Sequence, residues 1–444
     1  MTERTDCLQK FFNFLATRNI RYCVVGDTRG LPEVIPSDID IVVQEEYFQQ
    51  LPQVMYEFAV NEQKVLVQIL KHEPTAYYFV LAWITQEGTV CYLHPDICSG
   101  YYRNAWKFLT ASEIVDTSID SVNEAGLTKG FTIPKPDIAF IYYLLKKIDK
   151  GQLSQEHCAY LKENWDCKPE GCKFQIKRFW KGRYASILIR AAESNDWKSI
   201  LASLPKLRKS LHTGLAFSVV DVIRELIRKV GRVFKPTGLV VVFLGSDGCG
   251  KSSVINRIIN DLSPVFRKTE YVHLRPQLWM KQSGIGDSPI TDPHRKPPRS
   301  YFSSVAKMFY FFLDYNLGYL FKIRPLLVRS TLVVFDRYYY DLLVDPIRYR
   351  YGGPVWFSWF IGKLVPKPDI LFLLDAPPEV LQARKQEVSL KETTRQRNGY
   401  LQTVKRLRNS FVVDASQPLN KVISDVNRII LDHMKERTSK RIGN

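Results

Sequence analysis

A glycine-rich stretch between residues 245 and 252 carries the clearest chemical signal in this sequence. It reads GSDGCGKS, fits the pattern G-x-x-x-x-G-K-[ST], and lies between an apolar run and a helical pattern. Glycines let successive backbone N–H groups curl around a phosphate at a helix N-terminus, where the helix dipole favours anions. Lys251 would supply positive charge to the β- and γ-phosphates, and Ser252 a hydroxyl to Mg²⁺. The stretch predicts a nucleoside triphosphate site; the alternative is a glycine-rich turn without a ligand.

An aspartate and an arginine follow one another at the end of a second apolar run, STLVVFDR. A carboxylate at the C-terminal end of a strand faces the crevice in which open α/β sheets bind ligands. Asp336 is therefore a candidate for Mg²⁺ or its waters, and Arg337 for a substrate phosphate. A salt bridge at the end of a strand is the alternative reading.

The segment 381–401, LQARKQEVSLKETTRQRNGYL, is basic and polar and has no strong apolar face. A mobile lid that brings arginines to a transferring phosphoryl group has this composition, and such arginines contribute a factor of about 10³ to 10⁵ in rate. The candidates are Arg384, Lys391, Arg395 and Arg397. Each of them taken singly also fits a solvated surface charge.

Two aspartates near the start of the chain, in PSDIDIVV, suggest a second site. Asp38 and Asp40 are two residues apart on an expected strand, so their side chains share a face about 7 Å apart. Oxygen ligands in such a pair suit two-metal phosphoryl or nucleotidyl transfer with Mg²⁺. Asp96 in YLHPDIC is the expected third carboxylate, and Gly26 and Asp27 form the expected turn for a triphosphate. The alternative is a half-buried edge strand without a ligand.

The apolar runs define the elements that must position these groups. Residues 239–244 form a continuous apolar run after Pro236 and Gly238, as expected for a strand buried on both faces of a parallel sheet. The runs 330–336, 368–376 and 409–415 each follow a helical pattern, which predicts a doubly wound α/β sheet over residues 237–444. Strands and short helices over 1–135 predict an α+β domain, and 136–236 predicts a basic helical connector.

Composition limits the possible partners. The chain has 444 residues, is 45% hydrophobic and carries a formal charge of +18, so an anionic partner is expected: nucleotide phosphates, nucleic acid, an acidic glycan or a membrane surface. Between residues 141 and 240, 20 Lys and Arg stand against 9 Asp and Glu. Basic residues lie beside aromatic or branched ones in 173–184 and 221–235, which suits either an anionic membrane face or a solvated face on helices packed between domains.

The start of the chain lacks the pattern of a signal peptide, and the eight cysteines form no C-x-x-C pair. We therefore expect reduced thiols and a cytoplasmic protein, with the inner face of a membrane as a further option. Lys307, Asp314 and Asn316 interrupt the aromatic run 305–323, so this run is shorter than the roughly 18 apolar residues of a spanning helix. It is expected to form a buried helix.

The C-terminal motifs together resemble the thymidylate kinases. GSDGCGKSS, HLRP, FDRYYYD, PDILFLLDAPPEVLQAR, RNGYL and VVDASQPLNKV occur in the family's order over about 238–435. The resemblance implies a kinase with ATP on the glycine-rich loop, an acceptor beside the Asp-Arg pair, and a closing lid. It matches Arg275 to the arginine that faces the acceptor and Asp247 to the acidic loop residue. The implied cofactor-binding residues are Gly245, Asp247, Gly248, Gly250, Lys251, Ser252 and Ser253.

The sequence departs from the thymidylate kinases at two positions. Gly248 stands where some members have an arginine, so the lid would have to supply that charge, as in the bacterial type. Tyr315 follows Asp314 where the family has a base-contacting arginine, which makes these two residues substrate-binding candidates with an acceptor other than thymidylate. The chain looks closer to thymidylate-kinase-like proteins of bacterial surface-polysaccharide gene clusters, an analogy that suggests a sugar or glycan hydroxyl as acceptor.

The N-terminal pattern resembles the nucleotidyltransferase superfamily over roughly 10–120. That superfamily has an apolar residue, a Gly-Gly or Gly-Ser pair, and then a spaced Asp-x-Asp on a strand. Asp27 here replaces the usual small residue after Gly26. The resemblance implies either a metal-dependent transferase or a degenerate domain that binds a nucleotide, a glycan or a partner.

These features predict a kinase that uses ATP and Mg²⁺, joined to a nucleotidyltransferase-like domain. A nucleic-acid end-processing enzyme that pairs a polynucleotide kinase with a nucleotidyltransferase is one alternative, although no nucleic-acid module is evident. A non-catalytic nucleotide-binding switch is another. A homodimer and peripheral contact with a membrane through the basic helices are further expectations.

Overall fold

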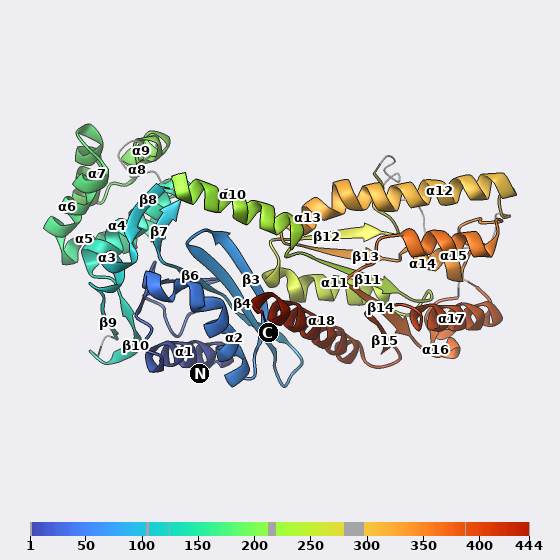
Figure 1. Cartoon of the computed structure of the whole chain (residues 1–444). Helices are drawn as coiled ribbons and strands as arrows, with labels where there is room; N and C mark the ends of the chain where they lie inside the picture. The colour runs from blue at the N-terminus through green and yellow to red at the C-terminus, as the bar shows by residue number, and fades with distance from the viewer. Residues whose placement is uncertain are drawn as a thin grey trace. The chain divides into compact units, whose positions relative to one another are not determined.

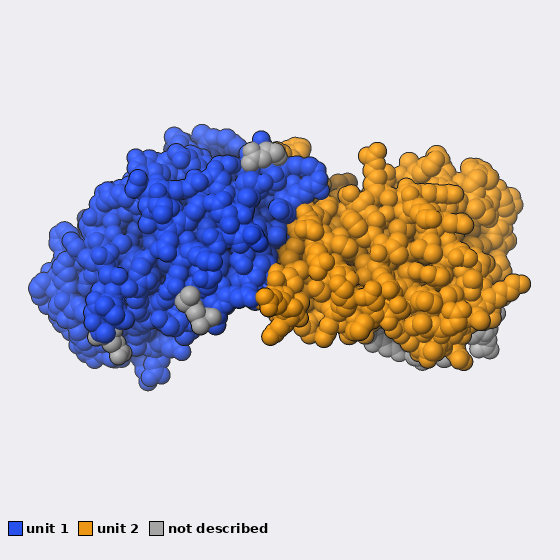
Figure 2. Space-filling view, turned by 90° about the horizontal axis from the view of Figure 1, so that it is seen from below, with its two compact units in different colours: residues 1–83, 91–230, 434–444 blue, residues 84–90, 231–433 orange. Residues whose placement is uncertain are grey.

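The computed structural model describes residues 2–103, 106–123, 125–211, 219–278, 297–386 and 388–443. The chain divides into two compact units (Figure 2). Unit 1 comprises residues 1–83, 91–230 and 434–444, and unit 2 comprises residues 84–90 and 231–433. The helical residues up to 230 therefore group with the N-terminal strands. Among the described residues, no helix combines the length and the apolar composition needed to cross a bilayer.

Unit 2 is built on a five-stranded parallel sheet with the strand order β12-β13-β11-β14-β15 (Figure 1). The strands are β11 (Leu239–Leu244), β12 (Lys268–His273), β13 (Thr331–Asp336), β14 (Ile370–Asp375) and β15 (Ser410–Asp414). Every residue of β11 and β13 is buried, as expected for central strands covered on both faces. The strand order reverses beside β11, and the crevice at such a switch point is where these sheets bind ligands. The expected parallel sheet is confirmed for this region.

The helices of unit 2 connect and cover these strands. They are α11 (Lys251–Leu262), η2 (Ser263–Val265), α12 (Tyr301–Gly318), η3 (Tyr319–Ile323), α13 (Arg324–Val328), α14 (Tyr339–Val344), α15 (Val355–Leu364), α16 (Pro378–Arg384), α17 (Leu390–Val404) and α18 (Leu419–Ile442). The residues of α18 from 434 onward group with unit 1. One core joins β11, β13 and β14 to residues of α12, α14, α15 and α17. The aromatic run 305–323 is helical as expected, but it is buried on one side only, because Phe309 and Phe321 are both more than half exposed.

Unit 1 contains a six-stranded sheet of mixed direction. Its strands are β1 (Tyr22–Val24), β2 (Ile39–Val43), β6 (Pro95–Cys98), β4 (Ala76–Ile84) and β3 (Val65–Glu73) in spatial order, with β5 (Val90–Leu93) paired to β4. β2 and β6 run parallel to each other, whereas β1 with β2, β3 with β4, and β4 with β6 are antiparallel pairs. The helices α1 (Glu3–Thr17) and α2 (Leu51–Asn61), the latter preceded by η1 (Glu45–Gln50), share one core with this sheet.

The remaining elements of unit 1 are two hairpins and a set of helices. These are β7 (Gly100–Arg103), β8 (Trp106–Thr110), α3 (Ala111–Val115), β9 (Ile119–Val122), β10 (Thr128–Ile133), α4 (Pro136–Lys150), α5 (Gln155–Cys167), α6 (Pro169–Phe179), α7 (Arg183–Ser194), α8 (Lys198–Leu201), α9 (Leu204–Leu211) and α10 (Val219–Phe234). The central helix is α4, which is buried along most of its length and shares a core with Val25, Val42 and Tyr101. This packing places α4 against the sheet end that carries the aspartates.

Candidate functional site

The glycine-rich loop of unit 2 leads directly from the buried strand β11 into helix α11. Gly245 has a φ of 146°, and a Cβ there would approach the Leu374 carbonyl oxygen to 2.6 Å, so a larger residue does not fit. Gly248 and Gly250 have φ values of 85° and 86°, which side-chain-bearing residues rarely adopt. Gly250 is the N-cap of α11. The loop therefore places backbone N–H groups and a positive helix end at the carboxyl end of β11, where a phosphate binds.

Lys251 is buried, and its ammonium group donates hydrogen bonds to carbonyl oxygens of its own loop. The distances are 2.7 Å from Nζ to Gly245 O and 3.1 Å to Ser246 O. These acceptors are neutral, and the lysine has no carboxylate partner among the described residues. The side chains of Ser252 and Ser253, in the first turn of α11, are exposed. A triphosphate in the loop would offer Lys251 the counter-charge that these carbonyls do not provide.

Asp336 ends β13, and β13 is the neighbour of β11 in the sheet. Its Oδ2 accepts a hydrogen bond of 3.0 Å from the hydroxyl of Tyr271, whereas its buried Oδ1 has no hydrogen-bond partner among the described residues. A buried carboxylate oxygen without a donor is costly unless a ligand satisfies it. Its position at the ligand-binding edge of the sheet therefore fits Mg²⁺, which prefers oxygen ligands.

Arg337 follows in the left-handed region, with a φ of 69°, and its backbone N–H donates to Phe243 O at 3.0 Å. Its buried guanidinium pairs with Asp341 at 3.1 Å and with Asp247. Asp247 also pairs with Arg348, which the sequence analysis did not single out. Arg337 is therefore engaged by two carboxylates in this structure, and it connects the glycine-rich loop to α14.

The structure does not bring the predicted lid arginines to one point. Arg384 donates to Ala415 O at 2.8 Å, Arg395 pairs with Glu392, and Arg397 makes two 2.8 Å hydrogen bonds to Asp375. Lys391 is exposed. Most of the predicted lid forms the helices α16 and α17, and Glu387 lies outside the described residues.

The predicted acceptor residues Arg275, Asp314 and Tyr315 are close together. Asp314 is fully buried; it accepts hydrogen bonds from Arg275 at 3.0 Å and from the backbone N–H groups of Gln277 and Leu278 at 3.2 and 2.7 Å. Tyr315 is buried and donates to Leu274 O. Asp314 and Tyr315 thus hold the segment 274–278 onto α12, and Arg275 is the member of this group that retains some exposure.

A cluster of cations surrounds this acceptor region. Burial and the neighbouring charges of Arg299, Arg350 and Arg275 lower the pKa of Lys307 to about 8. Lys307 donates a hydrogen bond to Tyr349 O, a neutral acceptor. Of these cations, only Arg275 was predicted from the sequence, because the other three lie up to 51 positions apart in a basic chain.

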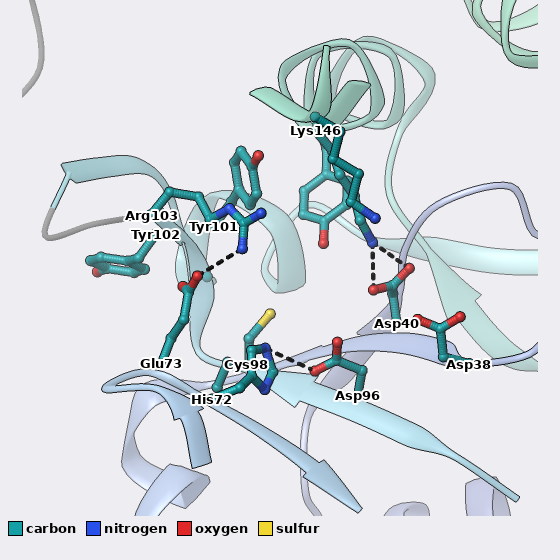
Figure 3. A pocket seen from close by; sticks show the side chains of 14 residues that line it. Asp38, Asp40, His72, Glu73, Asp96, Cys98, Tyr101, Tyr102, Arg103 and Lys146 are labelled. Carbon is teal, nitrogen blue, oxygen red and sulfur yellow. Dashed lines mark hydrogen bonds and ion pairs between the residues drawn. The ribbon is translucent and has the colours of Figure 1, made fainter. Parts of the chain in front are cut away.

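In unit 1, the three predicted carboxylates form one cluster (Figure 3). Asp38, Asp40 and Asp96 each offer an oxygen within 4.8 Å of the others, because β2 and β6 are parallel neighbours with Asp40 opposite Asp96. They line a cavity of about 200 Å³. Burial, together with repulsion from Asp40 and Asp38, raises the pKa of Asp96 to about 7. An all-oxygen ligand set of this kind fits Mg²⁺ or Mn²⁺, and a divalent cation would offset the repulsion.

Lys146 from α4 is the cation within this cluster, and sequence reasoning missed it. Its Nζ lies 2.6 Å from both Oδ1 and Oδ2 of Asp40, and the side chain is largely buried (Figure 3). His72 Nε2 lies 3.6 Å from Asp96. The helical spacing of α4 gave no signal for Lys146, because that helix belongs to a segment expected to be a connector.

The predicted triphosphate turn lies beside the same cluster. Gly26 has a φ of 93°, and a Cβ at this position would lie 3.5 Å from Asp40 Oδ2. Asp27, however, forms a bidentate pair with Arg29 at 2.8 and 2.5 Å. The turn therefore approaches the carboxylates through its glycine, while its aspartate is neutralised by an arginine.

The parallel sheet of unit 2, the G-x-x-x-x-G-K-S loop after its central strand and the Asp-Arg pair on the neighbouring strand define a P-loop kinase. The thymidylate kinase family model matches residues 243–426, so the C-terminal region is similar to a thymidylate kinase domain. A probable thymidylate kinase of Caldivirga maquilingensis is 28% identical over 204 residues, which span 43% of this chain and 92% of that protein. A probable thymidylate kinase of Staphylothermus marinus is 25% identical over 207 residues, which span 44% of this chain and 96% of that protein. The thymidylate kinase of Leuconostoc mesenteroides is 26% identical over 226 residues, which span 46% of this chain and 100% of that protein.

Proposed function

We propose that unit 2 transfers the γ-phosphoryl group of ATP, in the presence of Mg²⁺, to a phosphate-bearing acceptor of the nucleoside monophosphate class. The observation that carries this proposal is the position of the buried, unpaired Asp336 Oδ1 at the end of the strand next to the glycine-rich loop. An acceptor oxygen would form a bond to the γ-phosphorus as the bond to the β–γ bridging oxygen breaks, and ADP would leave.

The chain's own residues have distinct parts in this reaction. Lys251 would exchange its two carbonyl acceptors for phosphate oxygens, and Ser252 and Asp336 would hold Mg²⁺ or its waters. Mg²⁺, when bound, neutralises charge on the β- and γ-phosphates. Any of Arg384, Arg395 and Arg397 that assists the transferring group must first leave its present partner.

The charge around the acceptor region supports an anionic acceptor. Burial lowers the pKa of Lys307 most, and the positive charges of Arg299, Arg350 and Arg275 lower it further. Among the described residues, Asp314 is the one carboxylate that pairs with this cluster, through Arg275. A neutral sugar hydroxyl would not relieve this repulsion, and a phosphate would. The surface-polysaccharide acceptor suggested by analogy would therefore have to carry a phosphate or another acidic group.

We further propose that unit 1 is a metal-dependent nucleotidyltransferase-like domain. The clustering of Asp38, Asp40 and Asp96 at one cavity supports this second function, since two-metal nucleotidyl transfer needs such oxygen ligands. Asp27 forms an ion pair with Arg29, and Gly26 is the residue of this turn that lies next to Asp40.

Acceptor-dependent formation of ADP tests the kinase proposal. The purified full chain is assayed with ATP and Mg²⁺ against dTMP, other nucleoside monophosphates, neutral sugars, acidic oligosaccharides and 5′-hydroxyl oligonucleotides. Stimulation by a monophosphate is expected, and stimulation by neutral sugars only would contradict the proposed acceptor. Stimulation by oligonucleotides only would favour end processing, and nucleotide binding without turnover would favour a switch.

A pair of aspartate variants makes this assay specific to the site. Asp336→Asn is expected to lower kcat by about 10²-fold or more, because one electrostatic contact of this kind is worth about 10²–10³-fold. Asp369→Asn is the matched control, since Asp369 accepts a 2.7 Å hydrogen bond from Val240 N at the opposite end of the sheet. Equal activity in the two variants would remove Asp336 from the site.

A further inference from the structure

Helix α10 has an apolar face that no described part of the chain covers. Seven apolar residues between 219 and 230 are from 43% to 65% exposed: Val219, Val220, Val222, Ile223, Leu226, Ile227 and Val230. At about 100° per residue they occupy one uninterrupted side of the helix. A surface helix normally buries such a side in the core, and a continuous exposed apolar surface of this kind marks an interaction site.

The polar side of α10 is the side that is held by unit 1. Arg228 Nη1 donates to Lys71 O of β3 at 2.9 Å, and the arginine also pairs with Glu225 one turn earlier. Its side chain is only 11% exposed. Arg224 and Arg228 lie near enough to Lys71 to lower the pKa of that lysine, although burial is the larger cause. These contacts hold the polar side of the helix against β3, and the apolar side is exposed.

The charges beside the apolar face indicate what covers it. Residues 219–234 contain four basic and two acidic residues. Residues three, four or seven apart lie next to each other on the surface of a helix. Lys229 therefore lies beside Val222 and Leu226, at one edge of the apolar face. Arg224 lies beside Val220 and Ile227, at the other edge. Both basic residues are exposed. A basic rim around an inserted apolar side is the arrangement that binds anionic lipid headgroups.

From this geometry we propose that α10 docks unit 1 onto an anionic membrane surface. The apolar residues 219–230 enter the boundary between headgroups and acyl chains, and Arg224 and Lys229 contact the headgroups. A second copy of this chain fits less well, because two such faces in contact would bring their basic rims together. The proposal is independent of the proposed kinase and nucleotidyltransferase reactions.

Vesicle cosedimentation of the full-length protein tests the proposal. Vesicles of phosphatidylglycerol and phosphatidylcholine are compared with vesicles of phosphatidylcholine only, at low and high salt. Binding is expected to the anionic vesicles, to be weaker on the neutral ones, and to fall as salt is raised because charge contributes. Equal binding to both vesicle types, or no binding to either, would overturn the proposal.

Matched double variants assign the binding to α10. Leu226→Gln with Ile227→Gln is expected to lower the vesicle partition coefficient by about tenfold or more. Each substitution removes the favourable free energy of moving an apolar side chain from water into the membrane. Phe174→Gln with Leu201→Gln changes two exposed apolar residues on other helices of unit 1 and is expected to leave binding within about twofold. All four positions are exposed, so the thermal midpoint and the kinase activity should be unchanged and serve as folding controls.

Two results with these variants would contradict membrane docking. The first is an equal loss of vesicle binding in both double variants. The second is a wild-type dimer, detected by light scattering in the absence of vesicles, that the α10 variant converts to a monomer. That result would assign the face to a second copy of the chain.

Discussion

The two candidate sites hold their central lysines in different ways. In unit 2, Lys251 donates to carbonyl oxygens and a sulfur of its own loop, which lie at most six residues away in the sequence. In unit 1, Lys146 makes two 2.6 Å contacts to Asp40, a residue 106 positions away. The first lysine is ready to accept an anion, and the second already neutralises a carboxylate.

This difference teaches how each site would respond to its ligand. A phosphate at the glycine-rich loop replaces neutral hydrogen-bond acceptors with charged ones, which strengthens every bond that Lys251 makes. A metal ion at the carboxylate cluster must compete with the ammonium group of Lys146 for Asp40, and breaking a buried ion pair is costly. We therefore expect the unit 2 site to bind its ligand readily and the unit 1 site to bind a metal ion more weakly unless an anion draws Lys146 away.

The largest expected effect comes from removing the lysine of the loop. Lys251→Ala should lower the rate of phosphoryl transfer by about 10²–10³-fold, because a positioned charge at the transferring phosphates is lost. Stopped assays of ADP formation measure this, with circular dichroism to confirm folding. A folded variant with near-normal turnover would show that the loop is not the nucleotide site. The proposed difference between Lys251 and Lys146 would then be wrong for unit 2.

An intermediate effect is expected at the carboxylate cluster. Asp38→Asn should weaken Mn²⁺ binding by about tenfold to a hundredfold or more, since even outer-sphere changes at metal sites cost 10- to 100-fold. Asp38 is preferred to Asp40 because Asp40→Asn would leave the buried Lys146 without its partner and would destabilise the fold. Titration calorimetry with Mn²⁺ and no nucleotide measures the change.

Kinase turnover in the same carboxylate variants sharpens the comparison. The double variant Asp38→Ala with Asp40→Ala should keep phosphoryl transfer within about twofold of wild type if its fold is retained, since the glycine-rich loop belongs to the other unit. Loss of kinase activity in folded Asp38→Asn would mean that the two sites form one active centre, and the separation of the two activities would be wrong.

The smallest expected effect is a change in stability near the acceptor region. The pKa of Lys307 is about 8 when folded and 10.5 when unfolded, so stability should rise as pH increases from about 8 to 10.5. Below pH 8 both states are protonated, so the cost of burying the charge, which is the larger cause, and the repulsion from the arginines are then fully present. Lys307→Met should therefore raise the thermal midpoint by roughly 1–3 °C at pH 7, and this gain should shrink above pH 8.

Scanning calorimetry at pH 7 and pH 9.5 measures this difference. Lys322→Met serves as the control, because it also removes a hydrogen bond from a lysine to a carbonyl, Lys322 Nζ to Pro276 O at 2.8 Å, outside the cation cluster. A gain that is equal at both pH values, or equal in both variants, would mean that repulsion from the neighbouring arginines does not destabilise Lys307.

Much of unit 2 could be predicted because its signals are local. The apolar runs that became β11, β13, β14 and β15 are continuous in the sequence, and the loop motif lies directly after the first of them. The edge strand β12, which reads KTEYVH, was not singled out, because an exposed edge strand has no continuous apolar run. The partners of Arg337 and Arg397 were also not predictable, since an arginine's position in a motif says nothing about which carboxylate folds against it.

The sequence by itself determined the glycine-rich loop, the aspartate after β13 and the pair Asp38 and Asp40, because each depends on residues adjacent or nearly adjacent in the chain. The strand register brings Asp96, the expected third carboxylate, next to that pair. Only the tertiary structure decided that Lys146 neutralises Asp40 and that α10 turns its apolar side outward. These two features depend on helix packing over tens to hundreds of residues. The spacing of neighbouring residues carries no information about contacts between residues far apart in the sequence. Burial and charge pairing in the folded chain determine those contacts.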